Sequence, residues 1–236
     1  MNPLPAHPRH PRSASPPVAI FDLDGTLVDT AWDVAEALNP TLHEHGLPTL
    51  DRAQAAALMG HGLHRFAAGA FALHARTAEP RDIAAFVDRY AHHPVVHTQL
   101  YPDVRETLAQ LASAGWKLAV CTNKLERLAT DILRRLDLLA PFATVCGSDR
   151  APAKKPDPRH LEATLARAGL AGHAAVMIGD FSADLGAARA FGIPSIFACW
   201  GYGAPALAAD ATAAADHFRD LPALLATLVD AACTRK

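Results

Sequence analysis

The sequence predicts an α/β fold in which helices cover both faces of a doubly wound parallel sheet. Short apolar runs typical of buried strands alternate with segments whose apolar residues recur at helical spacing. This alternation favours right-handed βαβ units and therefore a parallel sheet. One long, purely helical stretch over residues 30–98 interrupts it. The sequence thus predicts a sheet-containing core from residues 18–29 and 99–236, with residues 30–98 as an inserted helical domain.

The first predicted strand, residues 18–21, ends in a group of polar residues. Asp22 and Asp24 follow it, and residues two apart on an extended chain point to the same side. Gly25 permits a tight turn, and Thr26 supplies a hydroxyl group. Because open α/β sheets bind ligands at the carboxyl ends of their strands, this group is a candidate functional site.

The inserted stretch contains four predicted helices. They are expected over residues 34–42, 51–59, 63–74 and 83–90. Pro40 should kink or restart the first helix, because proline lacks an amide hydrogen and clashes with the preceding turn. Asp51 is expected to cap the second helix. Gly60-His61-Gly62 separates the second helix from the third.

The remainder of the chain returns to the alternating pattern. Strands are expected over residues 117–121, 144–146, 175–178 and 194–198. Helices are expected over residues 104–111, 125–136, 161–168 and 182–189. Gly115 and Gly169 are suited to end the first and third of these helices, and Ser182 to cap the last.

Polar residues also follow two of these later strands. Thr122 and Asn123 come directly after the strand at 117–121, and Asp180 follows the strand at 175–178 through Gly179. A purely structural sheet would not need acids, a hydroxyl and an amide at successive strand ends. The chain has neither GxGxxG nor GxxxxGK[ST], which argues against dinucleotide and P-loop nucleotide binding.

Composition excludes several classes of function. The net charge is −2 and no basic run occurs, so nucleic acid is not an expected partner. No apolar run is long enough to cross a membrane. The four cysteines form no CxxC pair, which fits a reduced, cytoplasmic location, and the 13 histidines show no zinc-site spacing. Residues 1–17 are rich in proline and lack the apolar segment of a secretory signal, so they are predicted to be a disordered tail.

Taken in order, these motifs resemble those of the haloacid dehalogenase (HAD) superfamily. Asp22-Leu23-Asp24-Gly25-Thr26 resembles the first motif, and Thr122-Asn123 the second. Lys155 resembles the third, and Gly179-Asp180 with Asp184 the fourth. The resemblance covers roughly residues 18–205. It implies a Rossmann-like core, with residues 30–98 as a mobile cap.

The resemblance also implies an aspartyl-phosphate mechanism. Asp22 would be the nucleophile, and Asp24 would protonate the leaving group and later activate water. Dehalogenases lack an acid at the second position, so Asp24 favours a phosphatase or a mutase. Mg²⁺ would offset the charge of the phosphate, held by Asp22, Asp180 and the backbone carbonyl of Asp24.

Further residues receive roles from the same resemblance. Lys155 would offset negative charge, and Lys154 beside it is the alternative. Asp184 is either a second metal ligand, a residue that supports the ligands, or an ordinary acid in the first turn of a helix. Asp29 is expected to be structural. Three residues would bind the phosphoryl group alongside Lys155: Thr26, Thr122 and Asn123.

Two loops resemble the phosphoglycolate phosphatase branch of the superfamily. They are Gly60-His61-Gly62 and Cys199-Trp200-Gly201-Tyr202-Gly203, whereas Pro40 and Asp103 depart from that branch. His61 is either a ligand for an anionic leaving group or a solvated turn residue.

The expected activity is therefore Mg²⁺-dependent hydrolysis of a small phosphorylated metabolite, with 2-phosphoglycolate as the candidate. A sugar-phosphate phosphatase or phosphomutase of the same fold is the alternative. A catalytically silent binding protein is the alternative from a different class. The sequence does not distinguish a monomer from a homodimer.

Overall fold

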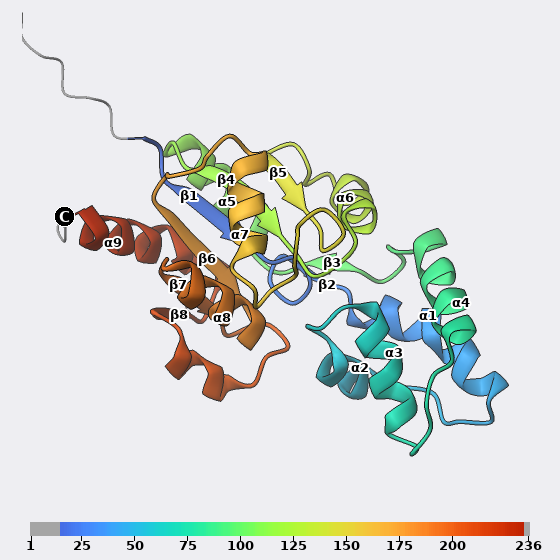
Figure 1. The fold of residues 1–236 in the computed structure, drawn as a ribbon. Helices are drawn as coiled ribbons and strands as arrows, with labels where there is room; N and C mark the ends of the chain where they lie inside the picture. Colours follow the sequence, from blue (N-terminus) through green and yellow to red (C-terminus); the bar gives the residue numbers. More distant parts are fainter. Residues whose placement is uncertain (1–14, 234–236) are drawn as a thin grey trace, which may run out of the picture.

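A six-stranded parallel sheet forms the centre of the structure, a computed structural model that describes residues 15–233 (Figure 1). Its strand order is β5-β4-β1-β6-β7-β8, with every neighbouring pair parallel. The strands are β1 (Val18–Phe21), β4 (Lys117–Cys121), β5 (Phe142–Cys146), β6 (Ala175–Gly179), β7 (Ser195–Ala198) and β8 (Ala213–Ala215). The predicted α/β fold class is confirmed.

Helices cover both faces of this sheet. They are α5 (Val104–Ser113), α6 (Glu126–Arg135), α7 (Arg159–Arg167), α8 (Ser182–Phe191) and α9 (Leu221–Cys233). Alternate residues of β1 enter two different cores: Ala19 and Phe21 pack with residues of α5, α6 and α9, whereas Val18 and Ile20 pack with residues of α7 and α8. A strand buried on both faces needs apolar residues throughout, which explains the continuous apolar runs in the sequence.

The four helices between β1 and α5 lie together beside the carboxyl ends of the strands (Figure 1). They are α1 (Ala31–Glu44), α2 (Arg52–Leu58), α3 (Leu63–Ala72) and α4 (Pro80–His92). The chain enters them through β2 (Val28–Asp29) and leaves through β3 (Gln99–Leu100), which form an antiparallel pair. The sequence analysis did not predict these two short strands. The division into domains at residues 30 and 98 stays a prediction.

Helix α1 runs through Pro40 without restarting, so the expected restart at that proline is wrong, while the kink stays a prediction. Contacts from α4 lie next to this proline. Arg89 of α4 donates to the carbonyl oxygen of Ala37 at 2.7 Å and to the hydroxyl of Thr41 at 3.0 Å. These contacts hold the turn around the proline and tie α1 to α4.

The two predicted helix caps have different outcomes. Asp51 caps α2 as expected: its carboxylate accepts from the amide of Gln54 at 2.8 Å, and the Gln54 side chain accepts from the Asp51 amide at 3.0 Å. Ser182 does not cap α8. It is the first residue of that helix, Phe181 occupies the cap position, and the Asp184 carboxylate accepts from the Phe181 amide at 3.0 Å. The start of α8 is therefore bonded by an acid in its first turn and not by the serine hydroxyl.

The two ends of the described region both contact the core. Residues 1–14 of the predicted tail lie outside the described residues, but Pro17 accepts a hydrogen bond from the Lys117 amide at 2.9 Å. At the other end, β8 follows a short 3₁₀ helix, η1 (Pro205–Asp210), and α9 follows another, η2 (Phe218–Asp220). The sequence analysis predicted none of these four elements. Within residues 15–233, no helix is long and apolar enough to cross a bilayer.

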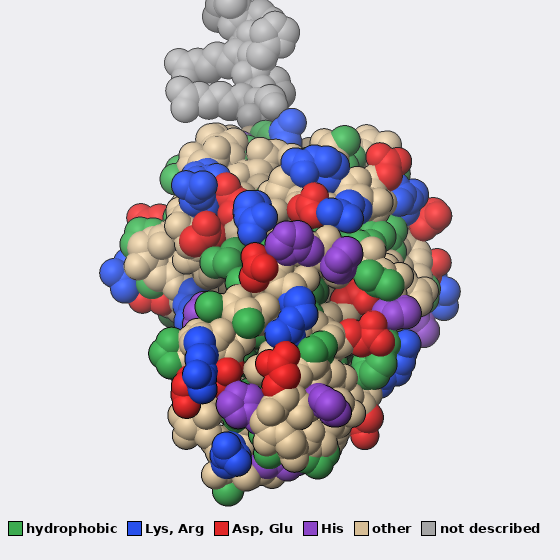
Figure 2. Space-filling view, turned by 90° about the vertical axis from the view of Figure 1, so that its right-hand side faces the viewer, with side chains coloured by type: hydrophobic (Ala, Val, Ile, Leu, Met, Phe, Trp, Pro, Cys, Tyr) green, Lys and Arg blue, Asp and Glu red, His purple; other side chains and the backbone are tan. Residues whose placement is uncertain are grey.

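Side chains of both charges are interspersed on the face of the molecule in Figure 2, which is the right-hand side of Figure 1. Lysine and arginine side chains lie next to aspartate and glutamate there. No broad area of one sign forms on this face among the described residues.

Candidate active site

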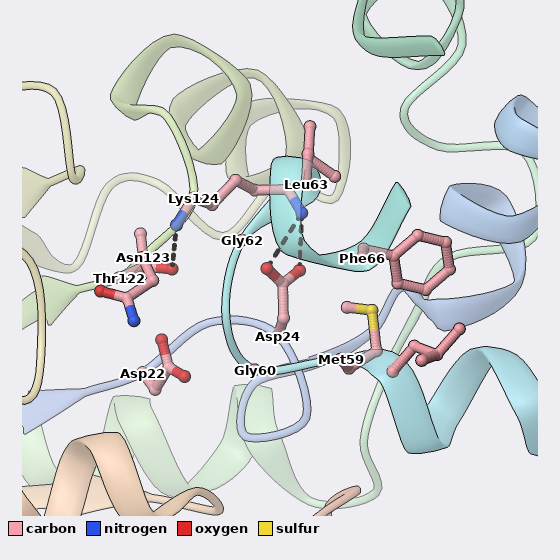
Figure 3. Close-up of a pocket in the computed structure, with 11 residues that line it drawn as sticks. Asp22, Asp24, Met59, Gly60, Gly62, Leu63, Phe66, Thr122, Asn123 and Lys124 are labelled. Atoms are coloured by element: carbon pink, nitrogen blue, oxygen red, sulfur yellow. Dashed lines mark hydrogen bonds and ion pairs between the residues drawn. The ribbon is translucent and has the colours of Figure 1, made fainter. Parts of the chain in front are cut away.

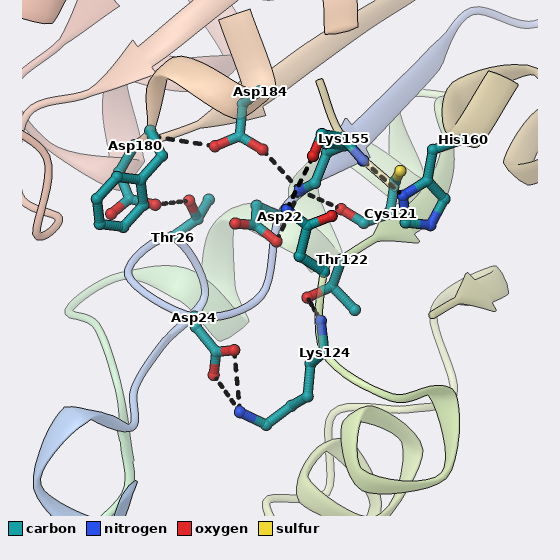
Figure 4. Close-up of polar contacts among 12 residues, drawn as sticks. Asp22, Asp24, Thr26, Cys121, Thr122, Lys124, Lys155, His160, Asp180 and Asp184 are labelled. Carbon is teal, nitrogen blue, oxygen red and sulfur yellow. Dashed lines mark hydrogen bonds and ion pairs between the residues drawn. The ribbon is translucent and has the colours of Figure 1, made fainter. Parts of the chain in front are cut away.

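Three carboxylates, one after β1 and two after β6, meet at the carboxyl edge of the sheet (Figure 4). Asp22 follows β1, Asp180 follows β6, and Asp184 lies in the first turn of α8. Each offers an oxygen atom within 4.8 Å of the others, and all three side chains are buried. The structure thus brings together residues that the sequence separates by up to 162 positions, counted from Asp22 to Asp184.

Lys155 binds this group of carboxylates. Its ammonium donates to Asp184 and to the carbonyl oxygen of Cys121, both at 2.6 Å, and lies 2.9 Å from a carboxylate oxygen of Asp22. Burial lowers the pKa of Lys155, but the charges of Asp184 and Asp22 more than reverse this and raise it above its usual range. Lys155 is 2% exposed, whereas Lys154 is exposed at the surface, which supports the choice between the two adjacent lysines.

A buried histidine that the sequence analysis did not single out helps to position Lys155. Nδ1 of His160 accepts from the Lys155 amide at 3.2 Å, and its Nε2 lies 3.2 Å from the carbonyl oxygen of Cys146. Burial and the charge of Lys155 lower the pKa of His160 to about 4, so the ring is neutral near pH 7. Its neutral form can make both contacts, as donor at one nitrogen and acceptor at the other.

Asp180 is held by neutral donors only. Thr26 donates to one carboxylate oxygen and the Tyr202 amide to the other, each at 2.9 Å. Thr26 was expected to bind phosphate, and in the structure its hydroxyl binds Asp180. Gly25 has φ +84°, and a Cβ atom there would overlap the Asp180 carboxylate, so this turn requires glycine.

The carboxylates fit a bound divalent cation. Asp22, Asp180 and Asp184 place three acids in a buried site that contains one lysine. Burial and the neighbouring negative charges raise the pKa of Asp22 to about 7, although the charge of Lys155 acts in the opposite direction. Burial and the charges of Asp22 and Asp184 raise the pKa of Asp180 well above its usual range. Oxygen ligands of this kind suit Mg²⁺. Asp22 and Asp180 would hold the ion, and Asp184 lies beside them with both its oxygens already bonded, to Lys155 and to the Phe181 amide.

Asp24 pairs with a second buried lysine, Lys124, which the sequence analysis missed. The Lys124 ammonium donates to both carboxylate oxygens of Asp24 at 2.9 Å, and the Thr30 hydroxyl donates to one of them at 2.6 Å. Figure 4 shows Lys124 on the side of Asp24 away from Lys155. Its position directly after Thr122-Asn123, at the end of a buried strand, was the available signal.

Thr122 and Asn123 lie at the end of β4, between the two lysines. The Thr122 hydroxyl accepts from the Lys124 amide at 3.2 Å, and the Asn123 amide group donates to the Lys155 carbonyl at 3.2 Å. Within the described residues, the side-chain oxygen of Asn123 is buried and has no partner. The Thr122 hydroxyl still has its hydrogen to donate and is suited to bind a phosphoryl oxygen, whereas the Asn123 side-chain oxygen can only accept a hydrogen bond.

Residues 58–66 close over these side chains and enclose a small cavity (Figure 3). The cavity has a volume of about 20 Å³, enough for about one water molecule. Its lining is Asp22, Asp24, Thr122, Asn123 and Lys124 from the core and Leu58, Met59, Gly60, Gly62, Leu63 and Phe66 from the inserted helices. A Cβ atom on Gly60 would lie 2.6 Å from the ring of Phe181, so glycine permits this close approach.

His61 does not line that cavity. It is exposed and lines a neighbouring surface pocket of about 360 Å³, together with Arg65, Asn123, Lys154 and Lys155. His61 also lines a smaller pocket together with Asn123 and Lys124, and its role in substrate binding stays a prediction.

The loop containing Tyr202 links the carboxylates to the start of α1. While its amide donates to Asp180, its hydroxyl accepts from the amides of Thr30 at 2.8 Å and Ala31 at 3.1 Å. The same hydroxyl donates to Asp29 at 2.7 Å, which fits the structural role expected for that acid.

This fold, with a cluster of carboxylates at the carboxyl ends of its strands, is that of a hydrolase. A family model described as haloacid dehalogenase-like hydrolase matches residues 19–198, and the chain belongs to that family. The chain is a phosphatase of the HAD type, as the sequence predicted.

Named relatives agree with this assignment. The chain is 38% identical to a phosphoglycolate phosphatase of Agrobacterium fabrum, over 90% of this chain and 94% of the relative. It is 43% identical to a phosphoglycolate phosphatase of Caulobacter vibrioides, over 77% of this chain and 78% of the relative. A crystal structure described as a predicted phosphoglycolate phosphatase from Haemophilus somnus is 26% identical with a TM-score of 0.80, covering 90% of this chain and 99% of that one.

Proposed function

We propose that this protein hydrolyses 2-phosphoglycolate through a phospho-Asp22 intermediate and requires Mg²⁺. One observation carries the proposal: Asp22 and Asp24 line the same enclosed cavity, each paired with its own buried lysine. The nucleophile and the general acid therefore lie on either side of the space that a phosphate monoester would occupy.

The first step is attack of an Asp22 carboxylate oxygen on phosphorus, with loss of the alkoxide. Two unit charges about 4 Å apart repel by about 4 kcal/mol at an effective dielectric of about 20. Lys155, 2.9 Å from Asp22, offsets part of this repulsion. Bound Mg²⁺, held by Asp22, Asp180 and the backbone carbonyl of Asp24, would supply further positive charge at the phosphoryl oxygens.

Asp24 completes both halves of the reaction. It gives its proton to the departing alkoxide oxygen and later takes a proton from the water that hydrolyses phospho-Asp22. Thr30 and Lys124 hold the carboxylate in place for both transfers. Closure of residues 58–66 over the cavity would keep bulk water away while the alkoxide leaves.

One finding supports 2-phosphoglycolate as the substrate. Several relatives carry the name phosphoglycolate phosphatase, at 37–43% identity.

The test is a phosphate-release assay across small phosphomonoesters with Mg²⁺, with EDTA and with Ca²⁺. We expect the highest kcat/KM for 2-phosphoglycolate, no activity in EDTA, and little recovery with Ca²⁺, whose looser coordination fits an octahedral site poorly. Asp22→Asn tests the nucleophile, and its kcat should fall at least about a hundredfold, or about 2.7 kcal/mol. Full activity in EDTA would exclude the metal, and a sugar phosphate as the best substrate would exclude 2-phosphoglycolate.

A further inference from the structure

Lys124 has hydrogen-bonding capacity that its known contacts do not use. Its side chain is 3% exposed and lines the cavity that contains Asp22 and Asp24. An ammonium group has three donors, and two of them go to the carboxylate oxygens of Asp24. Within residues 15–233 this ammonium makes no other hydrogen bond. One donor of a buried cation is therefore free on the wall of the cavity.

A tyrosine from the inserted helices lies beside this ammonium. The ring centroid of Tyr90, on α4, is 4.9 Å from Nζ of Lys124. The Tyr90 hydroxyl is buried and has no hydrogen-bond partner among the described residues. Burial raises the pKa of Tyr90 to about 12, so the hydroxyl keeps its proton and is a donor. Tyr90 does not itself line the cavity, so it can assist only through its contact with the Lys124 ammonium.

We propose that Lys124, assisted by Tyr90, binds the carboxylate of the substrate and so selects phosphate monoesters that carry an anion next to the phosphorylated carbon. This inference rests on the proposed function. Asp24 must contact the leaving oxygen to protonate it. In 2-phosphoglycolate only two covalent bonds separate that oxygen from the carboxylate carbon. A group that contacts Asp24 at 2.9 Å therefore lies within reach of the substrate carboxylate.

The surface pocket at His61 is less suited to this task. Its basic side chains His61, Arg65 and Lys154 are exposed, and its buried lysine, Lys155, already binds Asp22 and Asp184. None of the four lines the cavity that contains Asp24. Lys124 is the cation on the cavity wall, and its charge is less screened by solvent than those of the exposed side chains.

The experiment compares kcat/KM for 2-phosphoglycolate with kcat/KM for ethyl phosphate, in which a methyl group replaces the carboxylate. Lys124→Met should lower the ratio of these two values at least about tenfold, the effect expected for a lost hydrogen bond to a charged group. Tyr90→Phe should lower the ratio about threefold, as for a weaker bond. Lys154→Met is the matched control from the surface pocket and should leave the ratio unchanged. Activity on ethyl phosphate should also fall in Lys124→Met, because Asp24 loses a partner.

Lys124→Gln provides a second test if the methionine variant does not fold. Glutamine still donates to Asp24 but carries no charge, so the ratio should fall in this variant also. An equal loss for both substrates in the Lys124 variants would overturn the inference and leave Lys124 as a residue that only positions Asp24. A change in ratio for Lys154→Met but not for Lys124→Gln would also overturn it. If the unaltered protein shows no preference for 2-phosphoglycolate, the proposed substrate fails, and this inference fails with it.

Discussion

The two walls of the active-site cavity differ sharply in chemistry. The core wall carries two acids, a lysine, a threonine and an asparagine, and each acid lies 2.9 Å from a buried lysine ammonium. The wall from the inserted helices consists of apolar side chains and glycines: Leu58, Met59, Gly60, Gly62, Leu63 and Phe66. We infer that the core wall supplies the charges, whereas the helical wall determines the shape of the cavity and keeps water out. Changes in the core wall should therefore cost more than changes in the helical wall.

Lys155→Met should have the largest effect, because it leaves Asp22 and Asp184 buried without their cation. We expect a loss of at least about a hundredfold in kcat. The free energy of unfolding should fall by about 3 kcal/mol or more, as for other broken buried ion pairs. Phosphate release and thermal unfolding measure the two effects, with Lys154→Met as the exposed control. If Lys155→Met were as active as the control, the charges of the core wall would not account for catalysis.

The stabilising effect of Mg²⁺ should depend on pH. In the folded protein without metal, the pKa of Asp22 is raised from 3.8 to about 7, and that of Asp180 is also raised. An acid with a raised folded-state pKa stabilises the fold below about pH 4, and this contribution is lost as the pH rises towards 7. Mg²⁺ binds the ionised acids, so it should recover the loss at high pH.

We therefore expect Mg²⁺ to raise Tm more at pH 8 than at pH 5.5, by at least about 4 °C, or about 1–2 kcal/mol for a chain of this size. Thermal unfolding with Mg²⁺ and with EDTA at each pH gives the comparison, since other pH effects cancel within each pair. Equal increases at the two pH values would show that these carboxylates do not form the metal site.

Gly60→Ala should test the helical wall, with a smaller effect. The added methyl group would lie 2.6 Å from the ring of Phe181, so closure over the cavity should be hindered. We expect kcat/KM to fall about tenfold, as for other changes that hinder closure of a lid. Gly46→Ala is the matched control: Gly46 also has a positive φ, at +67°, but no atom lies within 4 Å of its added Cβ. Equal losses in both variants would trace the effect to backbone strain and not to the contact with Phe181.

Removal of residues 1–14 should have the smallest effect, and the effects of changes in either wall can be compared with it. Their proline-rich composition predicts no buried core. The shortened chain keeps Pro17, which accepts a hydrogen bond from Lys117. We expect Tm to change by less than about 1 °C, a small fraction of a kcal/mol. A loss of several degrees in thermal unfolding would contradict the prediction of a disordered tail.

The strand-end residues were predictable because local sequence determines them. An apolar run followed at once by Asp22, Thr122 or Asp180 identifies both the strand and the edge at which it ends. Lys155 was identified only through resemblance to a family motif. Its partner Asp184 lies 29 residues away, and no local pattern predicts their contact.

Features that depend on tertiary contacts were missed. Lys124 lies 100 residues from Asp24, and a lysine beside polar residues is usually a solvated loop residue. Strand β8 consists of three alanines, which have low strand propensity, and it forms through pairing with β7. The helix continues through Pro40 and is bonded to Arg89 of α4 on the adjacent turn, a contact between distant residues that the local sequence does not reveal.

The pairing of β2 with β3 has an evolutionary consequence. Because the two strands are adjacent, the inserted helices begin and end at nearly one point on the core. For a flexible segment joined at such a point, doubling its length costs only about 0.6 kcal/mol in closure entropy. Lids of different size and lining can therefore replace one another at this junction while the catalytic sheet keeps its register. New substrate preferences can arise by exchange of this one segment, without rebuilding the machinery that breaks the phosphate bond.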